Sequence, residues 1–139
     1  MSMEMQHVSY VYETGTSYEQ TALHDINLKI EDGQLIGIIG HTGSGKSTLI
    51  QLLNGLIRAS SGQVLFHGKN IYDPDFKMKE LRGKVGLVFQ YPEYQLFETT
   101  VLRDAAFGPK NQGLSEEEAV RKAQDALMTV GLTEQYWQM

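Results

Sequence analysis

The sequence predicts an α/β fold in which a buried β-strand, a glycine-rich loop and an amphipathic helix follow one another. Residues 35–39 are apolar at almost every position, as in a parallel strand that is covered on both faces. The glycine-rich stretch 40–47 follows, and residues 46–57 carry leucine and isoleucine on one helical face. Residues 84–90 form a second apolar run, which predicts another buried strand.

Shorter strands are predicted on either side of these central segments. Residues 5–13 and 26–30 alternate in the manner of half-buried strands. Residues 64–66 and 70–72 predict two more strands around a turn at His67-Gly68. The first half of the chain is therefore expected to be rich in β-structure.

Helices are predicted in the second half of the chain. An Asp-Pro pair at the start of residues 73–82 favours a short helix there, because proline suits the first helical position. Ser115 and Glu118 have the spacing of a capping box, and residues 116–130 carry the apolar stripe of a helix. Gly131 is placed to cap the C-terminal end of that helix.

Composition excludes several classes of function. The 139 residues carry a formal net charge of -5 without a long basic run, which argues against nucleic acid as a partner. The chain has no cysteine, so disulfides and thiolate metal sites are excluded, and its four histidines lack a metal-ligand spacing. No apolar stretch approaches the roughly 20 residues of a membrane span. We expect a cytosolic chain, or one attached to a membrane through a partner.

The stretch Gly40-His41-Thr42-Gly43-Ser44-Gly45-Lys46-Ser47 matches the phosphate-binding motif G-x-x-x-x-G-K-S/T. Glycines let several backbone N–H groups point at one anion, and the following helix adds a partial positive charge at its N-terminus. Lys46 is expected to bridge the β- and γ-phosphates, and the Ser47 hydroxyl to bind Mg²⁺. Thr48 is placed to contact the α-phosphate. The motif therefore predicts that the chain binds ATP with Mg²⁺.

Two other classes of P-loop protein are alternatives to an ATP-binding protein of this kind. A GTPase is disfavoured because the guanine-specifying sequence N-K-x-D is absent. A small-molecule kinase is compatible with the loop alone, and only the flanking sequence argues against it.

That flanking sequence resembles the ATPase subunits of ABC transporters from about Val8 to the C-terminus. Residues 23–28 and 62–68 match the pattern of that family. The resemblance implies that Tyr12 stacks on adenine and that Gln90 is the glutamine that contacts Mg²⁺ and the attacking water. It therefore implies that Lys46 and Gln90 are catalytic residues and that Ser47 and Gln90 bind the metal.

Residues 89–97, continued by 104–109, resemble the energy-coupling factor subgroup, whose members import vitamins and cobalt or nickel ions. The resemblance implies a second ATPase subunit, identical or related, a transmembrane coupling subunit and a substrate-binding membrane component. It places the chain at the cytoplasmic face of the membrane. Tyr94, Leu96 and Phe97 are expected to be exposed apolar groups that meet the membrane partner, with core packing as the alternative.

Other motifs of the resembled family are absent, namely the L-S-G-G-Q signature, a strand ending in Asp-Glu and the switch histidine. We therefore expect an N-terminal fragment with three parts: an antiparallel β part (1–33), the first half of a RecA-like core (34–92) and the start of a helical subdomain (93–139). Such a fragment is expected to bind ATP with little or no hydrolysis. Its core sheet would have a gap, and unpaired strand edges favour association or rearrangement.

Two alternatives to a transport ATPase remain open at this point. One is an ABC-type ATPase of DNA repair or translation, which the lack of basic clusters disfavours. The other is a module that binds nucleotide only as a structural ligand.

Overall fold

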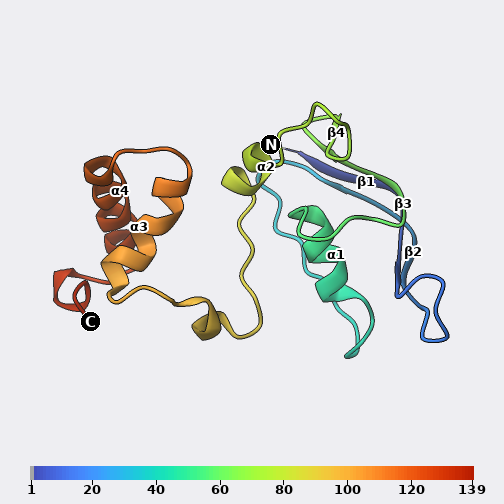
Figure 1. Ribbon diagram of the computed structural model, residues 1–139, viewed down its shortest axis with the longest axis horizontal. Helices are drawn as coiled ribbons and strands as arrows, with labels where there is room; N and C mark the ends of the chain where they lie inside the picture. Colours follow the sequence, from blue (N-terminus) through green and yellow to red (C-terminus); the bar gives the residue numbers. More distant parts are fainter. Residues whose placement is uncertain (1) are drawn as a thin grey trace. The chain divides into compact units, whose positions relative to one another are not determined.

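The computed structural model describes residues 2–139, which form two compact units that divide between Leu87 and Val88 (Figure 1). The first unit contains an antiparallel sheet with two helices, and the second contains a pair of helices. Tyr12 and the whole glycine-rich loop belong to the first unit, whereas Gln90 belongs to the second. The three-part division drawn from the sequence stays a prediction.

The sheet of the first unit is antiparallel throughout its described strands. These are β1 (Met3–Tyr12), β2 (Gln20–Ile30), β3 (Ser61–Phe66) and β4 (Lys69–Asn70), in the order β2-β1-β3-β4. β1 pairs with β2 on one side and β3 on the other. The four short strands predicted from the sequence are present with other bounds: β2 and β3 begin several residues earlier than expected, and β4 covers Lys69–Asn70 instead of 70–72.

One hydrophobic core joins this sheet to α1 (Lys46–Leu53) and α2 (Met78–Lys84). Met5, Val8 and Phe66 from the sheet, Leu52 from α1 and Leu81 from α2 are each at most 2% exposed. Fully burying a side chain of this size contributes roughly 1.5–3 kcal/mol. The core therefore fixes α1, and with it the end of the glycine-rich loop, against the sheet.

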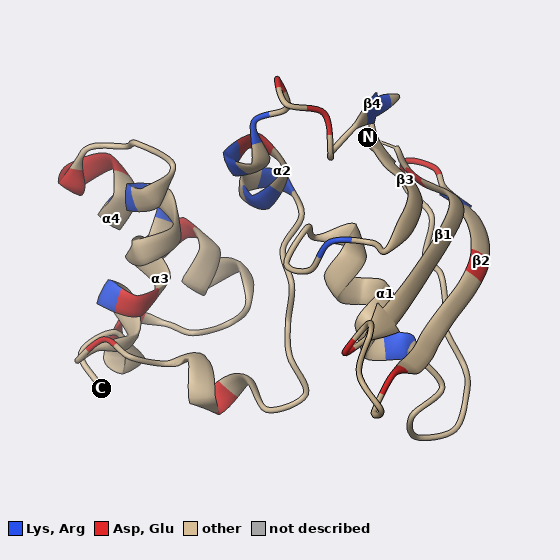
Figure 2. Ribbon diagram, turned by 45° about the vertical axis from the view of Figure 1, so that its right-hand side comes forward, with Lys and Arg blue, Asp and Glu red and all other residues tan. Residues whose placement is uncertain are grey.

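The helix predicted over residues 73–82 begins later than expected. Residues 73–76 form turns, in which the Phe76 N–H donates to the Asp73 carbonyl oxygen at 3.0 Å, and α2 starts only at Met78. Arg82 donates to the Gly55 carbonyl oxygen at 2.9 Å and so ties α2 to the chain that follows α1. Figure 2 shows that α2 carries a cluster of lysine and arginine residues (blue).

The two buried parallel strands predicted at residues 35–39 and 84–90 are not present. Neither segment pairs with a strand in the described part of the chain, and the side chains of Leu35, Ile39 and Val88 are 80% exposed or more. The physical reason is that an apolar run becomes a buried strand only when neighbouring strands and covering helices supply the burial. Residues 35–39 and 85–90 have no strand ladder, and Lys84 is the last residue of α2.

The second unit is built around α3 (Val101–Asn111) and α4 (Glu116–Thr129), with short 3₁₀ helices η1 (Pro92–Gln95) and η2 (Glu134–Tyr136). Three alanines, Ala106, Ala119 and Ala123, are at most 1% exposed and let the two helices approach closely. The predicted capping box is confirmed, because Ser115 accepts from the Glu118 N–H while the Glu118 carboxylate accepts from the Ser115 N–H.

Candidate phosphate-binding site

The glycine-rich loop runs from Gly40 into the first turn of α1. Gly43 and Gly45 have φ values of 81° and 88°, a region that glycine enters without steric cost. The Ser44 N–H donates to the His41 carbonyl oxygen at 3.2 Å and closes a tight turn within the loop. The Gly45 carbonyl oxygen accepts the first helical hydrogen bond, from the Leu49 N–H at 2.9 Å. The loop is therefore continuous with the helix.

Gly45 also fits closely against β2. A Cβ atom at this position would lie 2.6 Å from the Ala22 carbonyl oxygen and 2.8 Å from Leu23 Cδ2, both shorter than real contacts allow. The backbone angle and the available space therefore both require glycine, and the start of α1 can touch the sheet edge only because Gly45 lacks a side chain.

Several backbone N–H groups of the loop and the helix start have no protein acceptor among residues 2–139. These belong to Gly43, Gly45, Lys46 and Ser47. The first N–H groups of any helix lack an acceptor within the helix, and the helix dipole adds about half a positive charge at the same place. A cluster of free N–H groups with this potential is suited to bind an anion such as a phosphate.

The Lys46 ammonium folds back over the loop. Its Nζ donates to the carbonyl oxygens of Gly40 and His41 at 2.7 and 2.8 Å, and to the Ser44 hydroxyl at 3.3 Å. The His41 ring in turn donates through Nδ1 to the Thr42 carbonyl oxygen at 2.8 Å. The lysine therefore holds the loop in a curled shape, with its cation close to the cluster of N–H groups.

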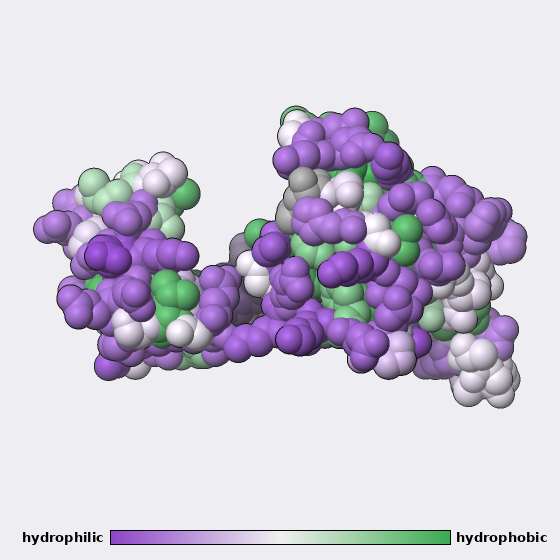
Figure 3. Space-filling view, turned by 90° about the horizontal axis from the view of Figure 1, so that it is seen from above, coloured by the Kyte–Doolittle hydropathy of each residue, from purple (hydrophilic) through white to green (hydrophobic). Residues whose placement is uncertain are grey.

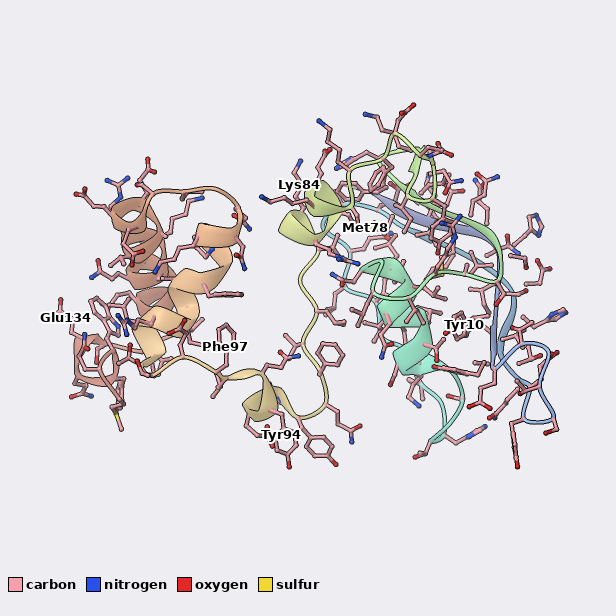
Figure 4. The ribbon with its side chains drawn as sticks, in the orientation of Figure 1. Tyr10, Met78, Lys84, Tyr94, Phe97 and Glu134 are labelled. Atoms are coloured by element: carbon pink, nitrogen blue, oxygen red, sulfur yellow. The ribbon has the colours of Figure 1, made fainter. Side chains whose placement is uncertain are left out.

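Tyr12 lies at the same site, at the end of β1. Its hydroxyl forms a 2.8 Å hydrogen bond with the Thr48 hydroxyl in the first turns of α1. Its ring packs edge-on against Tyr10, with centroids 4.8 Å apart and planes at 83°. Figure 4 shows the labelled Tyr10 beside α1. The Tyr12 side chain is 41% exposed, so part of the ring is open to a ligand.

A cavity of about 240 Å³ brings most of these residues together. It is lined by Tyr12, Gln20, Ala22, Gly43, Gly45, Lys46, Ser47 and Thr48. Gln20 and Ala22 were missed from the sequence. Gln20 pairs with Tyr12 across the β1–β2 hairpin, and this pairing could have been found only by knowing that residues 13–19 form the connecting turn.

A larger cavity of about 590 Å³ lies beside β3 and β4, lined by residues that include Lys69, Asp73 and Phe76. Its lining mixes both signs of charge and contains no residue of the glycine-rich loop. We therefore take the smaller cavity as the functional one, because its chemistry matches a defined ligand group.

Gln90 and the aromatic segment that follows belong to the second unit. The Gln90 side chain is exposed, and no strand precedes it, so the interpretation of Gln90 as the end of a buried strand was wrong. Its catalytic and metal-binding roles stay predictions. Tyr94, Leu96 and Phe97 are each more than 60% exposed, and Figure 4 shows where Tyr94 and Phe97 lie on the segment before α3.

Phe97 is partly held in place. Its ring packs edge-on against Phe107 at 4.6 Å, and its N–H donates to the Asp104 carboxylate at 3.2 Å. Asp104 also accepts from the Glu98 N–H, so one carboxylate orders the approach to α3. The alternative that these residues are simple core packing is contradicted by their exposure.

The ABC transporter family model matches residues 23–138, which is most of the chain and includes the whole glycine-rich loop. The chain belongs to the ABC transporter family. The lysine and serine of the G-x-x-x-x-G-K-S/T motif open α1, but the buried strand expected directly before the loop is not present among the described residues.

Curated ABC relatives are about half identical to this chain over the region that they match. The energy-coupling factor transporter ATP-binding protein EcfA2 of Caldanaerobacter subterraneus is 53% identical over 135 residues, covering 97% of this chain and 47% of the relative. EcfA2 of Streptococcus agalactiae is 53% identical over 136 residues, covering 96% of this chain and 49% of the relative. The chain therefore spans about half the length of the curated relatives it matches.

Solved ABC structures share its fold. The structure of cbiO1 from Clostridium perfringens, described as part of the ABC transporter complex cbiONQ, has a TM-score of 0.77 at 38% identity and covers 97% of this chain and 52% of that one. The dimeric ATP-binding cassette MJ0796 in a post-hydrolysis state with ADP and Pi has a TM-score of 0.79 at 26% identity, covering 98% and 60%. The predicted fold class, a partial ABC-type ATPase domain, is confirmed.

None of the helices in residues 2–139 combines the length and hydrophobicity needed to cross a lipid bilayer. The same residues contain no group of three or more His, Cys, Asp or Glu side chains arranged to bind a metal ion.

Proposed function

We propose that this chain binds the phosphates of ATP in the ATP-binding subunit of an energy-coupling factor importer. The observation that carries the proposal is the cluster of unpaired loop N–H groups beside the Lys46 ammonium, in a cavity that also contains an exposed tyrosine. This combination offers a polyphosphate site with a flat apolar surface next to it. The EcfA2 relatives, which are named as ATP-binding proteins, support the same ligand.

Each residue of the site has a part in this proposal. The loop from Gly40 to Ser44 curls around the β- and γ-phosphates, and the Gly45 and Lys46 N–H groups add donors from the helix start. Lys46 exchanges its carbonyl partners for phosphate oxygens. Thr48 donates to the α-phosphate, and the Tyr12 ring stacks on adenine, a contact worth about 1–3 kcal/mol for bases in nucleic-acid complexes.

The residues present fit a magnesium ion that arrives with the nucleotide. Mg²⁺ is commonly held by one or two protein oxygens together with substrate phosphates and water. Ser47 supplies such an oxygen, because its exposed side chain stands at the start of α1 and lines the cavity. The metal-binding role of Gln90, which belongs to the second unit, stays what the family resemblance implies. Bound Mg²⁺ would neutralise charge on the phosphates, while the loop N–H groups and Lys46 orient them.

The proposal extends to partners and location. The exposed aromatic segment that contains Tyr94, Leu96 and Phe97 is suited to meet the transmembrane coupling subunit at the cytoplasmic face of the membrane. A second ATPase subunit would complete the site, as the dimeric MJ0796 cassette supports. In the complete assembly the bound ATP is hydrolysed to drive import of a vitamin or metal ion, whereas residues 1–139 alone bind nucleotide without efficient hydrolysis.

Titration calorimetry with MgATP tests the site. We expect Lys46→Ala to weaken binding by about 10- to 100-fold, since a hydrogen bond to a charged group contributes about 1.5–3 kcal/mol. Lys77→Ala removes one positive charge at the residue before α2 and serves as the control, with affinity unchanged. Equal affinities for the Lys46→Ala variant and the unmodified chain would contradict the proposed site.

A further inference from the structure

The hydrogen bond between Tyr12 and Thr48 connects two parts of the cavity that come from distant places in the sequence. It joins the end of β1 to the first turns of α1 over 2.8 Å, although the residues are 36 positions apart. Thr48 is the buried polar residue of α1, with a side chain only 5% exposed. Tyr12 in turn is the exposed aromatic ring of the cavity.

The chemistry of the two hydroxyl groups gives this bond a direction when a nucleotide is present. A threonine hydroxyl has one hydrogen to donate and two lone pairs to accept with. If Thr48 donates its hydrogen to a phosphate oxygen, its lone pair accepts from the Tyr12 hydroxyl. Hydrogen bonds in such a chain polarise and strengthen one another, more so when the last acceptor is charged.

The Tyr12 ring has few other restraints. Tyr10 packs against it edge-on, and Gln20 lies across from it in the hairpin. The residues that follow, 13–19, form an exposed turn with positive φ values at Glu13 and Gly15. The bond to Thr48 therefore fixes the outer end of a ring that would otherwise be free to rotate about its side-chain bonds.

We propose that the Tyr12–Thr48 hydroxyl pair couples the base part of the nucleotide site to its phosphate part. Thr48 is then a positioning residue for the ring as well as a phosphate contact, and phosphate binding holds the ring in the orientation that stacks on the base. This inference rests on the proposed function. It predicts that loss of the Tyr12 hydroxyl weakens the binding of a ligand with a base more than the binding of a bare polyphosphate.

The test compares MgATP with magnesium tripolyphosphate by titration calorimetry on the chain. Tyr12→Phe keeps the ring and removes only the hydroxyl, and we expect it to weaken MgATP binding about three- to tenfold and tripolyphosphate binding clearly less. Thr48→Val is expected to weaken both ligands. In a Thr48→Val background, Tyr12→Phe should have no further effect on MgATP, whereas Thr48→Ser should restore both affinities.

Three results would overturn the coupling. Tyr12→Phe could bind MgATP as the unmodified chain does, it could lose tripolyphosphate equally, or its effect could persist undiminished on the Thr48→Val background. Far-UV circular dichroism of each variant separates misfolding from these outcomes. If Thr48→Val unfolds, the affinities of Thr48→Ser and of Tyr12→Phe for the two ligands decide the question. The Lys46→Ala variant separates failure of the proposed site from failure of the coupling. If Lys46→Ala binds MgATP as the unmodified chain does, the proposed phosphate site is wrong and the coupling is wrong with it.

Discussion

Two glycines of the phosphate loop are constrained to different degrees. Gly43 and Gly45 both have positive φ, but a Cβ atom on Gly43 would meet nothing within 4 Å, whereas one on Gly45 would collide with the backbone of β2. Alanine at position 43 therefore tests the cost of the backbone angle alone. Alanine at position 45 tests the same cost together with a steric clash.

We expect Gly43→Ala to destabilise the first unit by about 1–2 kcal/mol, the cost of a left-handed conformation for an L-residue. Gly45→Ala should cost more, and it should also displace α1 from β2 and weaken MgATP binding. Urea unfolding followed by circular dichroism, together with titration calorimetry, measures both effects. Gly86→Ala, at a position with open space and without positive φ, is the control. An equal cost at positions 43 and 45 would contradict the steric account.

The structure brings Lys46, Ser47 and two glycines of the motif to one cavity, because the motif depends on backbone angles and spacing that are local; their roles in binding stay predictions. Gln20 and Ala22 escaped prediction because they join the cavity only through strand pairing. Even the Tyr12 interpretation needed a family resemblance, since an alternating strand gives no sign of which tyrosine ends beside a helix.

Among the elements, α4 has a well-defined start. The Ser115 hydroxyl and N–H both donate to the Glu118 carboxylate, and these bonds hold the pKa of Glu118 below its usual range. Because the pKa of Glu118 is lowered in the folded state, the interaction stabilises the fold at pH values above the ordinary pKa of a glutamate. That stabilisation is lost as the pH falls through the lowered pKa. Figure 2 shows the acidic start of α4 in red.

Ser115→Ala should destabilise the second unit by about 0.5–2 kcal/mol, as found for loss of an N-cap side chain. Ser115→Asp retains an acceptor for the helix N–H groups and is expected to recover most of the stability at neutral pH. Hydrogen exchange of the α4 amides is the measurement, and exchange rates in Ser115→Ala equal to those of the unmodified chain would exclude a role for the cap.

Elements differ in how well periodicity predicts them. α1 and α4 have clear apolar stripes, whereas α3 contains Gly108 and Pro109 and was not predicted as a helix from the sequence. Residues 35–39 and 84–90 show the opposite error, since strands were predicted there and are absent. Their composition suits buried strands, but a strand also needs partners, and hydrophobicity alone cannot report whether those partners are present.

For the whole molecule, the main consequence is an exposed apolar surface. Leu35 and Ile39 are almost fully exposed, and their backbone has no ladder partner within the described residues. Figure 3 shows one face on which hydrophilic residues (purple) predominate with apolar ones (green) among them. Unpaired extended segments rich in isoleucine and leucine are templates for pairing with another chain.

Sedimentation velocity over a range of concentrations should therefore detect self-association of the chain. The double substitution Leu35→Lys with Ile39→Lys is expected to reduce it strongly without lowering stability, since neither side chain is buried. Ser17→Lys with Thr21→Lys adds the same charge at exposed positions elsewhere in the first unit and should leave association nearly unchanged. A chain that stays monomeric without any substitution would contradict this prediction.

The lysine of the phosphate loop has one more consequence. Because the Lys46 ammonium already contacts three oxygens of its own loop, an incoming phosphate does not meet a bare cation. Capture of the nucleotide is an exchange of partners, in which two released carbonyl groups must turn to solvent. The lysine then adds less to affinity than its charge suggests, and in return the empty loop keeps a shape that the next ligand can enter without refolding it.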